Sequence, residues 1–130
     1  MTWVSKRELF EQADILTIHL VLSDRSRGLV DAEALGWMKP SARLVNTARG
    51  PIVDEQALVR ALQNGQLAGA ALDVFSEEPL PADHPFRQLD NVLATPHVGY
   101  VSEQNYRQFY QQMIEDIQAW ANQAPLRPLN

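Results

Sequence analysis

The sequence predicts an α/β fold in which helices cover both faces of a parallel sheet. Short apolar segments alternate along the chain with segments in which apolar residues recur at helical spacing. Each apolar segment is followed by polar residues, as expected where a strand ends. Because right-handed crossovers place successive strand ends on one rim, residues that follow different strands can meet in space.

Four strands are expected, and they cover residues 14–20, 42–46, 68–75 and 92–95. The first shows almost no alternation of polar and apolar residues, which predicts burial on both faces. The third is rich in small residues. A proline-containing loop, residues 76–91, separates the third strand from the fourth.

Four helices are expected between and after these strands. A capping box, Ser5-Lys6-Arg7-Glu8, begins the first. Asp31 is a plausible cap for a second helix that reaches Trp37. The third covers residues 54–64, and the fourth covers residues 102–121, where aromatic and aliphatic side chains recur at helical spacing and are better explained by packing than by cofactor binding.

Composition limits the possible functions. The chain has 130 residues, no cysteine and a net charge of -5, so we expect one domain, no disulfide and no cysteine-bound zinc. Scattered basic residues and a negative net charge argue against a nucleic-acid partner. No apolar run is long enough to cross a bilayer, so we expect no membrane partner and a cytoplasmic location. We also expect no metal site.

Three chemically active side chains follow three successive strands: Arg49, Glu78 and His97. An imidazole is the usual proton donor or acceptor near neutral pH, and a neighbouring carboxylate orients it. An arginine presents a planar fork that suits a carboxylate. Together these groups suit hydride transfer to or from a 2-oxo or 2-hydroxy acid, with the hydride supplied by a cofactor.

Each candidate also has a structural interpretation. Arg49 alone could be a surface residue, His97 a turn residue and Glu78 a solvated loop acid. His19 could simply line the cleft, and His84 suits a structural or exposed position. An acid inside an apolar strand, such as Asp73, requires a partner or a ligand because an unpaired buried charge is costly.

Four blocks of sequence carry a resemblance to a known family. They are ADILTIHL at 13–20, NTARGPIVD at 46–54, GAALDVFSEEP at 69–79 and NVLATPHVG at 91–99. In this order and spacing they resemble the D-isomer-specific 2-hydroxyacid dehydrogenases, which include phosphoglycerate, glycerate, D-lactate and formate dehydrogenases. The resemblance implies a Rossmann-type, three-layer NAD-binding domain, here residues 1–130, with residues 102–121 as the helix that crosses back.

The resemblance also implies roles for single residues. Arg49 would anchor the substrate carboxylate and carbonyl, His97 would be the acid/base, and Glu78 would be its paired carboxylate. Asp73 would bind the nicotinamide carboxamide. The full set of residues expected to contact NAD, or NADP, is His19, Thr47, Ala48, Arg49, Asp73, His97 and Gly99.

One expected feature of the family is missing from the sequence. The six glycines are dispersed and form no Gly-x-Gly-x-x-Gly turn for the pyrophosphate. The resemblance therefore implies a truncated domain that lacks the Gly-rich first half and the substrate domain. Expected partners are a small 2-oxo or 2-hydroxy acid and either a second copy of the chain or a partner that supplies the missing half. The alternative is a non-catalytic fragment or an interaction module completed by another chain.

Overall fold

The computed structural model describes residues 2–128, which divide after His97 into two compact units. The first contains all the strands and the second contains the long C-terminal helix. The expected single partial domain stays a prediction.

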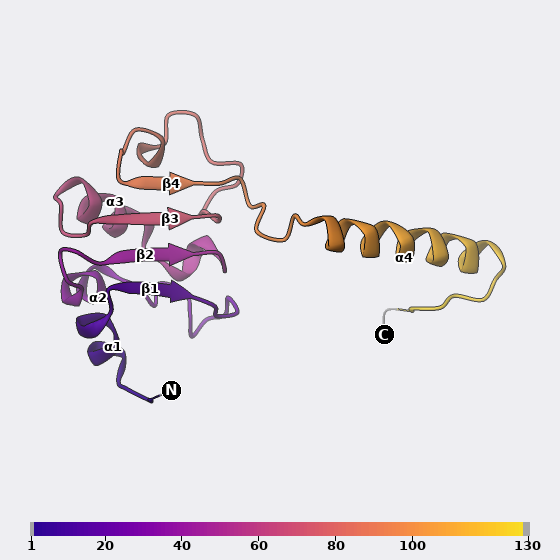
Figure 1. The fold of residues 1–130 in the computed structure, drawn as a ribbon, viewed down its shortest axis with the longest axis horizontal. Helices are drawn as coiled ribbons and strands as arrows, with labels where there is room; N and C mark the ends of the chain where they lie inside the picture. The colour runs from indigo at the N-terminus through magenta and orange to yellow at the C-terminus, as the bar shows by residue number, and fades with distance from the viewer. Residues whose placement is uncertain (1, 129–130) are drawn as a thin grey trace. The chain divides into compact units, whose positions relative to one another are not determined.

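The N-terminal unit is built on a parallel four-stranded sheet in the order β1-β2-β3-β4 (Figure 1). The strands are β1 (Ile15–Ile18), β2 (Arg43–Asn46), β3 (Gly69–Leu72) and β4 (Val92–Ala94). Each lies within its predicted range, and the predicted parallel α/β class is confirmed. Among the described residues β1 and β4 are the edges of the sheet.

The two faces of the sheet differ in burial. Strand register aligns Leu16 with Leu44 and Ala70, and all three side chains are buried. The adjacent row of aligned residues faces the other side of the sheet. It runs from Thr17 on β1 to Leu93 on β4, and Leu93 is 66% exposed. The prediction that the first strand is buried on both faces is therefore wrong, because its alternate residues face solvent and Ile15 is 65% exposed. The apolar sequence of a strand is compatible with burial on both faces, but it does not show that another element packs on each face.

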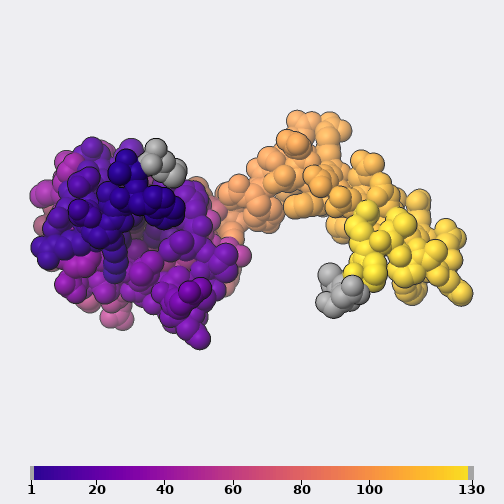
Figure 2. Space-filling view, turned by 90° about the horizontal axis from the view of Figure 1, so that it is seen from below, coloured from indigo at the N-terminus to yellow at the C-terminus, as the bar shows by residue number. Residues whose placement is uncertain are grey.

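Three helices contribute to the core of this unit: α1 (Lys6–Gln12), α2 (Ala32–Trp37) and α3 (Glu55–Gln63). Their buried residues share one hydrophobic cluster with the buried row of the sheet, so within the described residues of this unit helices cover one face, whereas helices were expected on both. The side of the unit seen in Figure 2 carries the indigo N-terminal segment, which contains α1.

Capping side chains lie where these helices begin, at the predicted caps Ser5 and Asp31 and also at Asp54. Ser5 and Glu8 form the complete capping box of α1. Asp31 accepts a 2.8 Å hydrogen bond from the amide of Ala34, and Asp54 accepts one of 2.9 Å from Ala57. These bonds satisfy amides that have no partner inside a helix.

The C-terminal unit contains α4 (Glu103–Ala121), which lies within the predicted range 102–121 and is capped by Ser102. Arg127 folds back onto this helix, with 3.0 Å ion pairs to Glu115 and Asp116. The apolar side chains at helical spacing are exposed; they are Tyr106, Phe109, Tyr110, Met113, Ile114, Ile117 and Trp120. Within residues 2–128 no helix has the combination of length and apolar character required to cross a membrane.

Candidate functional site

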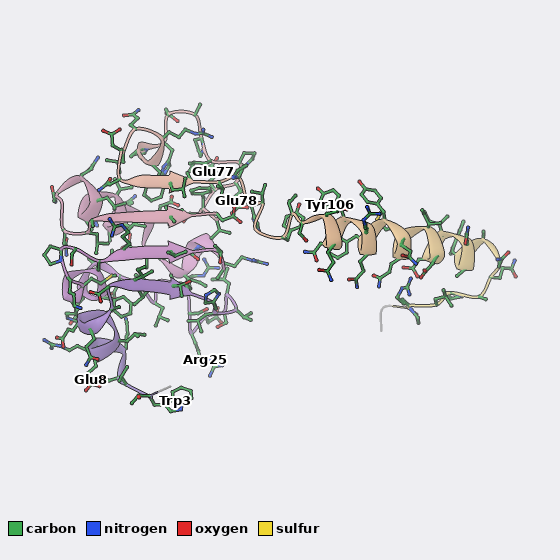
Figure 3. All side chains as sticks on the ribbon, in the orientation of Figure 1. Trp3, Glu8, Arg25, Glu77, Glu78 and Tyr106 are labelled. Carbon is green, nitrogen blue, oxygen red and sulfur yellow. The ribbon has the colours of Figure 1, made fainter. Side chains whose placement is uncertain are left out.

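The candidate site lies at the carboxyl ends of β2, β3 and β4. The turn after β2 carries Arg49, the loop after β3 carries Glu78, and His97 follows β4. Figure 3 shows Glu77 and Glu78 in the loop beyond the arrowhead of β3. The three candidates therefore lie at the carboxyl edge of the sheet, where the parallel topology predicted them.

His97 and Glu78 form a direct pair. Nδ1 of His97 lies 2.7 Å from Oε2 of Glu78, and both side chains are somewhat more than one-third exposed. Oε1 of Glu78 accepts a 2.9 Å hydrogen bond from the amide of Phe75. The carboxylate therefore has a different fixed donor on each of its oxygens.

These contacts lower the pKa of Glu78 below its ordinary value. The hydrogen bond with His97 is the largest cause, and partial burial opposes it. The Phe75 amide and the positive charges of His97 and Arg49 add to the lowering. Because an ionised carboxylate only accepts hydrogen bonds, Nδ1 of His97 must carry the shared proton.

The backbone of His97 has a φ of 56°, in the left-handed region that few residues other than glycine adopt. Such conformations are often found at functional sites, where surrounding contacts hold them. Here the imidazole is held by Glu78 and the amide of His97 donates to the carbonyl of Thr95 at 3.0 Å.

Buried Asn46 shapes the turn that carries Arg49. Its side-chain amide donates to the carbonyl of Arg49 at 3.0 Å, and its side-chain oxygen accepts from the amide of Ala48 at 3.0 Å. Gly50 directly follows Arg49 and packs against the loop after β3. A Cβ added at Gly50 would lie 2.0 Å from the carbonyl carbon of Phe75. This close approach keeps the Arg49 turn beside the segment that positions Glu78.

Two cavities flank this rim. One of about 530 Å³ includes Glu78 and His97 in its lining, together with Phe75, Pro79, Leu80, Arg87, Ala94, Thr95 and Pro96. The other, of about 510 Å³, is lined by His19, Leu20, Val21, Leu22, Thr47, Ala48 and Arg49. Four residues expected to contact the cofactor, His19, Thr47, Ala48 and Arg49, therefore share one cavity.

Asp73 has the partner that the sequence required. It is buried just beyond β3, and the hydroxyl of Thr95 donates to its Oδ1 atom. Its amide donates to the carbonyl of Asn46 at 3.0 Å. Gly99 belongs to the C-terminal unit, so its expected cofactor contact stays a prediction, as do the roles of the other site residues.

Sequence reasoning missed the residues that hold the site in place. Asn46 is a polar residue at the end of an apolar strand, and this position was a usable signal; the structure shows that its side chain is buried and hydrogen-bonded. The amide of Phe75 gave no signal, because every residue except proline carries one. No group of three or more histidine, aspartate or glutamate side chains in the described part of the chain is arranged to hold a metal ion.

Residues 1–99 match the family described as "D-isomer specific 2-hydroxyacid dehydrogenase, NAD binding domain". The chain belongs to this family. It is 52% identical over 91 residues to a glyoxylate reductase of Thermofilum pendens, covering 70% of this chain and 27% of that protein. It is also 50% identical over 100 residues to an (S)-sulfolactate dehydrogenase of Chromohalobacter salexigens, covering 76% of this chain and 32% of that protein.

The fold of the chain is also similar to that of solved structures. A phosphoglycerate oxidoreductase from Vibrio cholerae is 39% identical with a TM-score of 0.85, covering 94% of this chain and 39% of that one. A D-isomer-specific 2-hydroxyacid dehydrogenase from Xanthobacter autotrophicus, solved with NADPH and MES, is 38% identical with a TM-score of 0.73, covering 92% of this chain and 49% of that one. The chain thus spans 27% and 32% of the length of the two curated relatives above. The match of residues 1–99 to the family confirms the family that the sequence motifs indicated.

Proposed function

We propose that this chain forms the nicotinamide side of an NAD(P)-dependent oxidoreductase that interconverts 2-hydroxy and 2-oxo acids. The observation that carries the proposal is the pairing of His97 with Glu78, on a rim where the charge of Arg49 acts on the same carboxylate. The family is described as an NAD-binding domain, and a similar structure was solved with NADPH.

The residues at this rim fit the nicotinamide end of the cofactor. A carboxylate at Asp73 can accept hydrogen bonds from a carboxamide, and the turn at 47–49 offers backbone and side-chain groups beside a cavity. When bound, the cofactor supplies or accepts the hydride. The sequence contains no Gly-x-Gly-x-x-Gly turn, so pyrophosphate contacts of that kind would come from a segment outside these 130 residues.

Each catalytic side chain has a task that its geometry supports. Nδ1 of His97 is engaged by Glu78, so Nε2 is the atom that exchanges a proton with the substrate oxygen. The Glu78 carboxylate orients the ring and stabilises its protonated form. Arg49 binds the substrate carboxylate through its guanidinium and polarises the neighbouring carbonyl.

The first test is a calorimetric titration of NADH into the chain. Micromolar binding that is lost in Asp73→Ala and kept in Asp90→Ala supports the proposal, since Asp90 is an exposed acid just before β4. Absence of binding at millimolar NADH contradicts cofactor binding by this chain alone.

Reduction of glyoxylate by NADH then tests the chemistry. His97→Gln should abolish turnover while leaving NADH binding measurable, because the variant removes the proton donor and changes only one of the residues expected to contact the cofactor. Arg49→Lys should raise KM, since lysine keeps the charge but loses the planar fork. An unchanged KM would remove Arg49 from substrate binding.

The uncovered sheet face favours a second candidate, an interaction module that another chain completes. Ile15 and Leu93 are 65% and 66% exposed on that face, and exposed apolar surface of this kind promotes association. Absence of NADH binding, combined with concentration-dependent association in sedimentation experiments, would favour this candidate. A monomer that binds NADH would contradict it. A cytoplasmic location stays a prediction.

A further inference from the structure

A polar contact outside the catalytic rim joins α3 to the loop that carries Glu78. Oε2 of Glu55, in the first turn of α3, accepts a 3.0 Å hydrogen bond from the amide of Ser76. Oε1 of Glu55 lies 3.3 Å from Nε2 of His84, at the far side of the same loop. Their side chains are only 22% and 17% exposed, so water screens this contact less than it screens a surface pair.

His84 is itself held in one orientation. Its Nδ1 atom accepts a 3.2 Å hydrogen bond from the amide of Phe86, and its ring centroid lies 4.8 Å from that of Phe86. Because Nδ1 accepts a hydrogen bond, the ring proton resides on Nε2, the nitrogen that faces Glu55. The Glu55 carboxylate therefore accepts a hydrogen bond from Ser76 on one oxygen and lies close to the protonated nitrogen of His84 with the other, so it contacts two distant points of the loop.

The link continues to the catalytic pair. Ser76 directly follows Phe75, whose amide holds Oε1 of Glu78. The other oxygen of Glu78 meets His97. Fixing Ser76 therefore fixes the backbone that orients the Glu78 carboxylate.

We propose that Glu55 and His84 are positioning residues, which clamp the loop so that Glu78 is aligned with His97 before substrate binds. This role rests on the function proposed above. Neither residue lines the cavity that contains Glu78 and His97, so neither is expected to touch the reacting atoms. Alignment in advance lowers the entropic cost of reaching the reactive geometry.

Nuclear magnetic resonance on the full chain tests the clamp without cofactor or substrate. In Glu55→Ala, the amides of Ser76 and Phe75 should exchange with solvent about tenfold faster, as expected when a hydrogen bond to a charged group is lost. The ¹⁵N signals of His97 should also show a smaller population with the proton on Nδ1. Glu77→Ala, the same change at an exposed neighbour, should alter neither readout.

The clamp is overturned if Glu55→Ala speeds exchange at Ser76 alone and leaves Phe75 and the His97 signals unchanged. A second variant, His84→Asn, covers the case in which Glu55→Ala disturbs the whole sheet. Asparagine can still accept a hydrogen bond from the amide of Phe86 but is too short to reach Glu55. The same changes in amide exchange and in the His97 signals are therefore expected, but smaller. No change in His84→Asn would remove His84 from the clamp. Because these readouts need no NADH, they are independent of whether the proposed oxidoreductase function holds.

Discussion

The side-chain amide of Asn46 donates a 3.0 Å hydrogen bond to the carbonyl of Arg49, three residues further along the chain. The oxygen of the same side chain accepts from the amide of Ala48, so one buried residue bonds to two backbone groups of the turn. The position of Arg49 therefore depends on a residue that sits below the rim and lines neither of the cavities beside it.

Asn46→Leu should destabilise the fold by about 1–3 kcal/mol, because it removes the acceptor of the part-buried Ala48 amide and one of the two donors to the Arg49 carbonyl, the other being the amide of Ile52. Urea denaturation measures the free energy of unfolding. The same substitution at exposed Asn64 should change that free energy by less than about 0.5 kcal/mol. Equal effects at the two positions would contradict the structural role of Asn46.

Gly50→Ala should cost about 3 kcal/mol, since the new Cβ would lie 2.0 Å from the backbone of Phe75. Gly36→Ala is the matched control. Gly36 lies inside α2 and the nearest atom to its added Cβ is 3.7 Å away, so alanine should stabilise by about 0.5–1 kcal/mol through helix propensity. Thermal unfolding of both variants should therefore show shifts of opposite sign.

The Glu78–His97 pair should make stability depend on pH on the acid side. The pKa of Glu78 is lowered in the folded state, so its contribution is present above the ordinary carboxyl value of 4.5 and is lost as the pH falls below it. The difference in unfolding free energy between the natural chain and Glu78→Gln should shrink on that descent. Because both side chains are more than one-third exposed, the difference should stay below about 1 kcal/mol. A difference that grows as the pH falls would contradict the pairing.

The two faces of the sheet should respond differently to truncation. Leu44→Ala on the covered face should cost about 2–5 kcal/mol, whereas Leu93→Ala on the other face should cost less than about 0.5 kcal/mol. Denaturation at several protein concentrations measures both. A large cost at Leu93 that grows with concentration would mean that a second copy covers this face.

The sequence predicted the strands and helices because their signals are local. Ser5, Asp31, Asp54 and Ser102 cap helices through bonds to residues within a single turn, so the chain itself carries the information. The rim of the sheet was also predictable, since parallel connections place the residues after β2, β3 and β4 together. The family resemblance supplied the roles of Arg49, Glu78 and His97, and these roles remain to be tested.

Two features of the structure could not be predicted from the sequence. The exposure of Ile15 depends on what covers the sheet face, and no property of the strand itself determines that. The contact between Glu55 and Ser76 joins residues 21 positions apart through a backbone amide, which leaves no mark in the side-chain pattern. Long-range hydrogen bonds from side chains to the backbone are therefore visible only in the structure.

Backbone amides provide much of the support for the candidate site. Those of Ala48, Phe75 and Ser76 donate to Asn46, Glu78 and Glu55. Nineteen of the twenty amino acids supply such a donor, and proline alone lacks it. An exposed position such as Ser76 can therefore diverge widely during evolution while its bond to Glu55 survives. Most substitutions at Ser76 would therefore keep this donor, whereas proline would remove it.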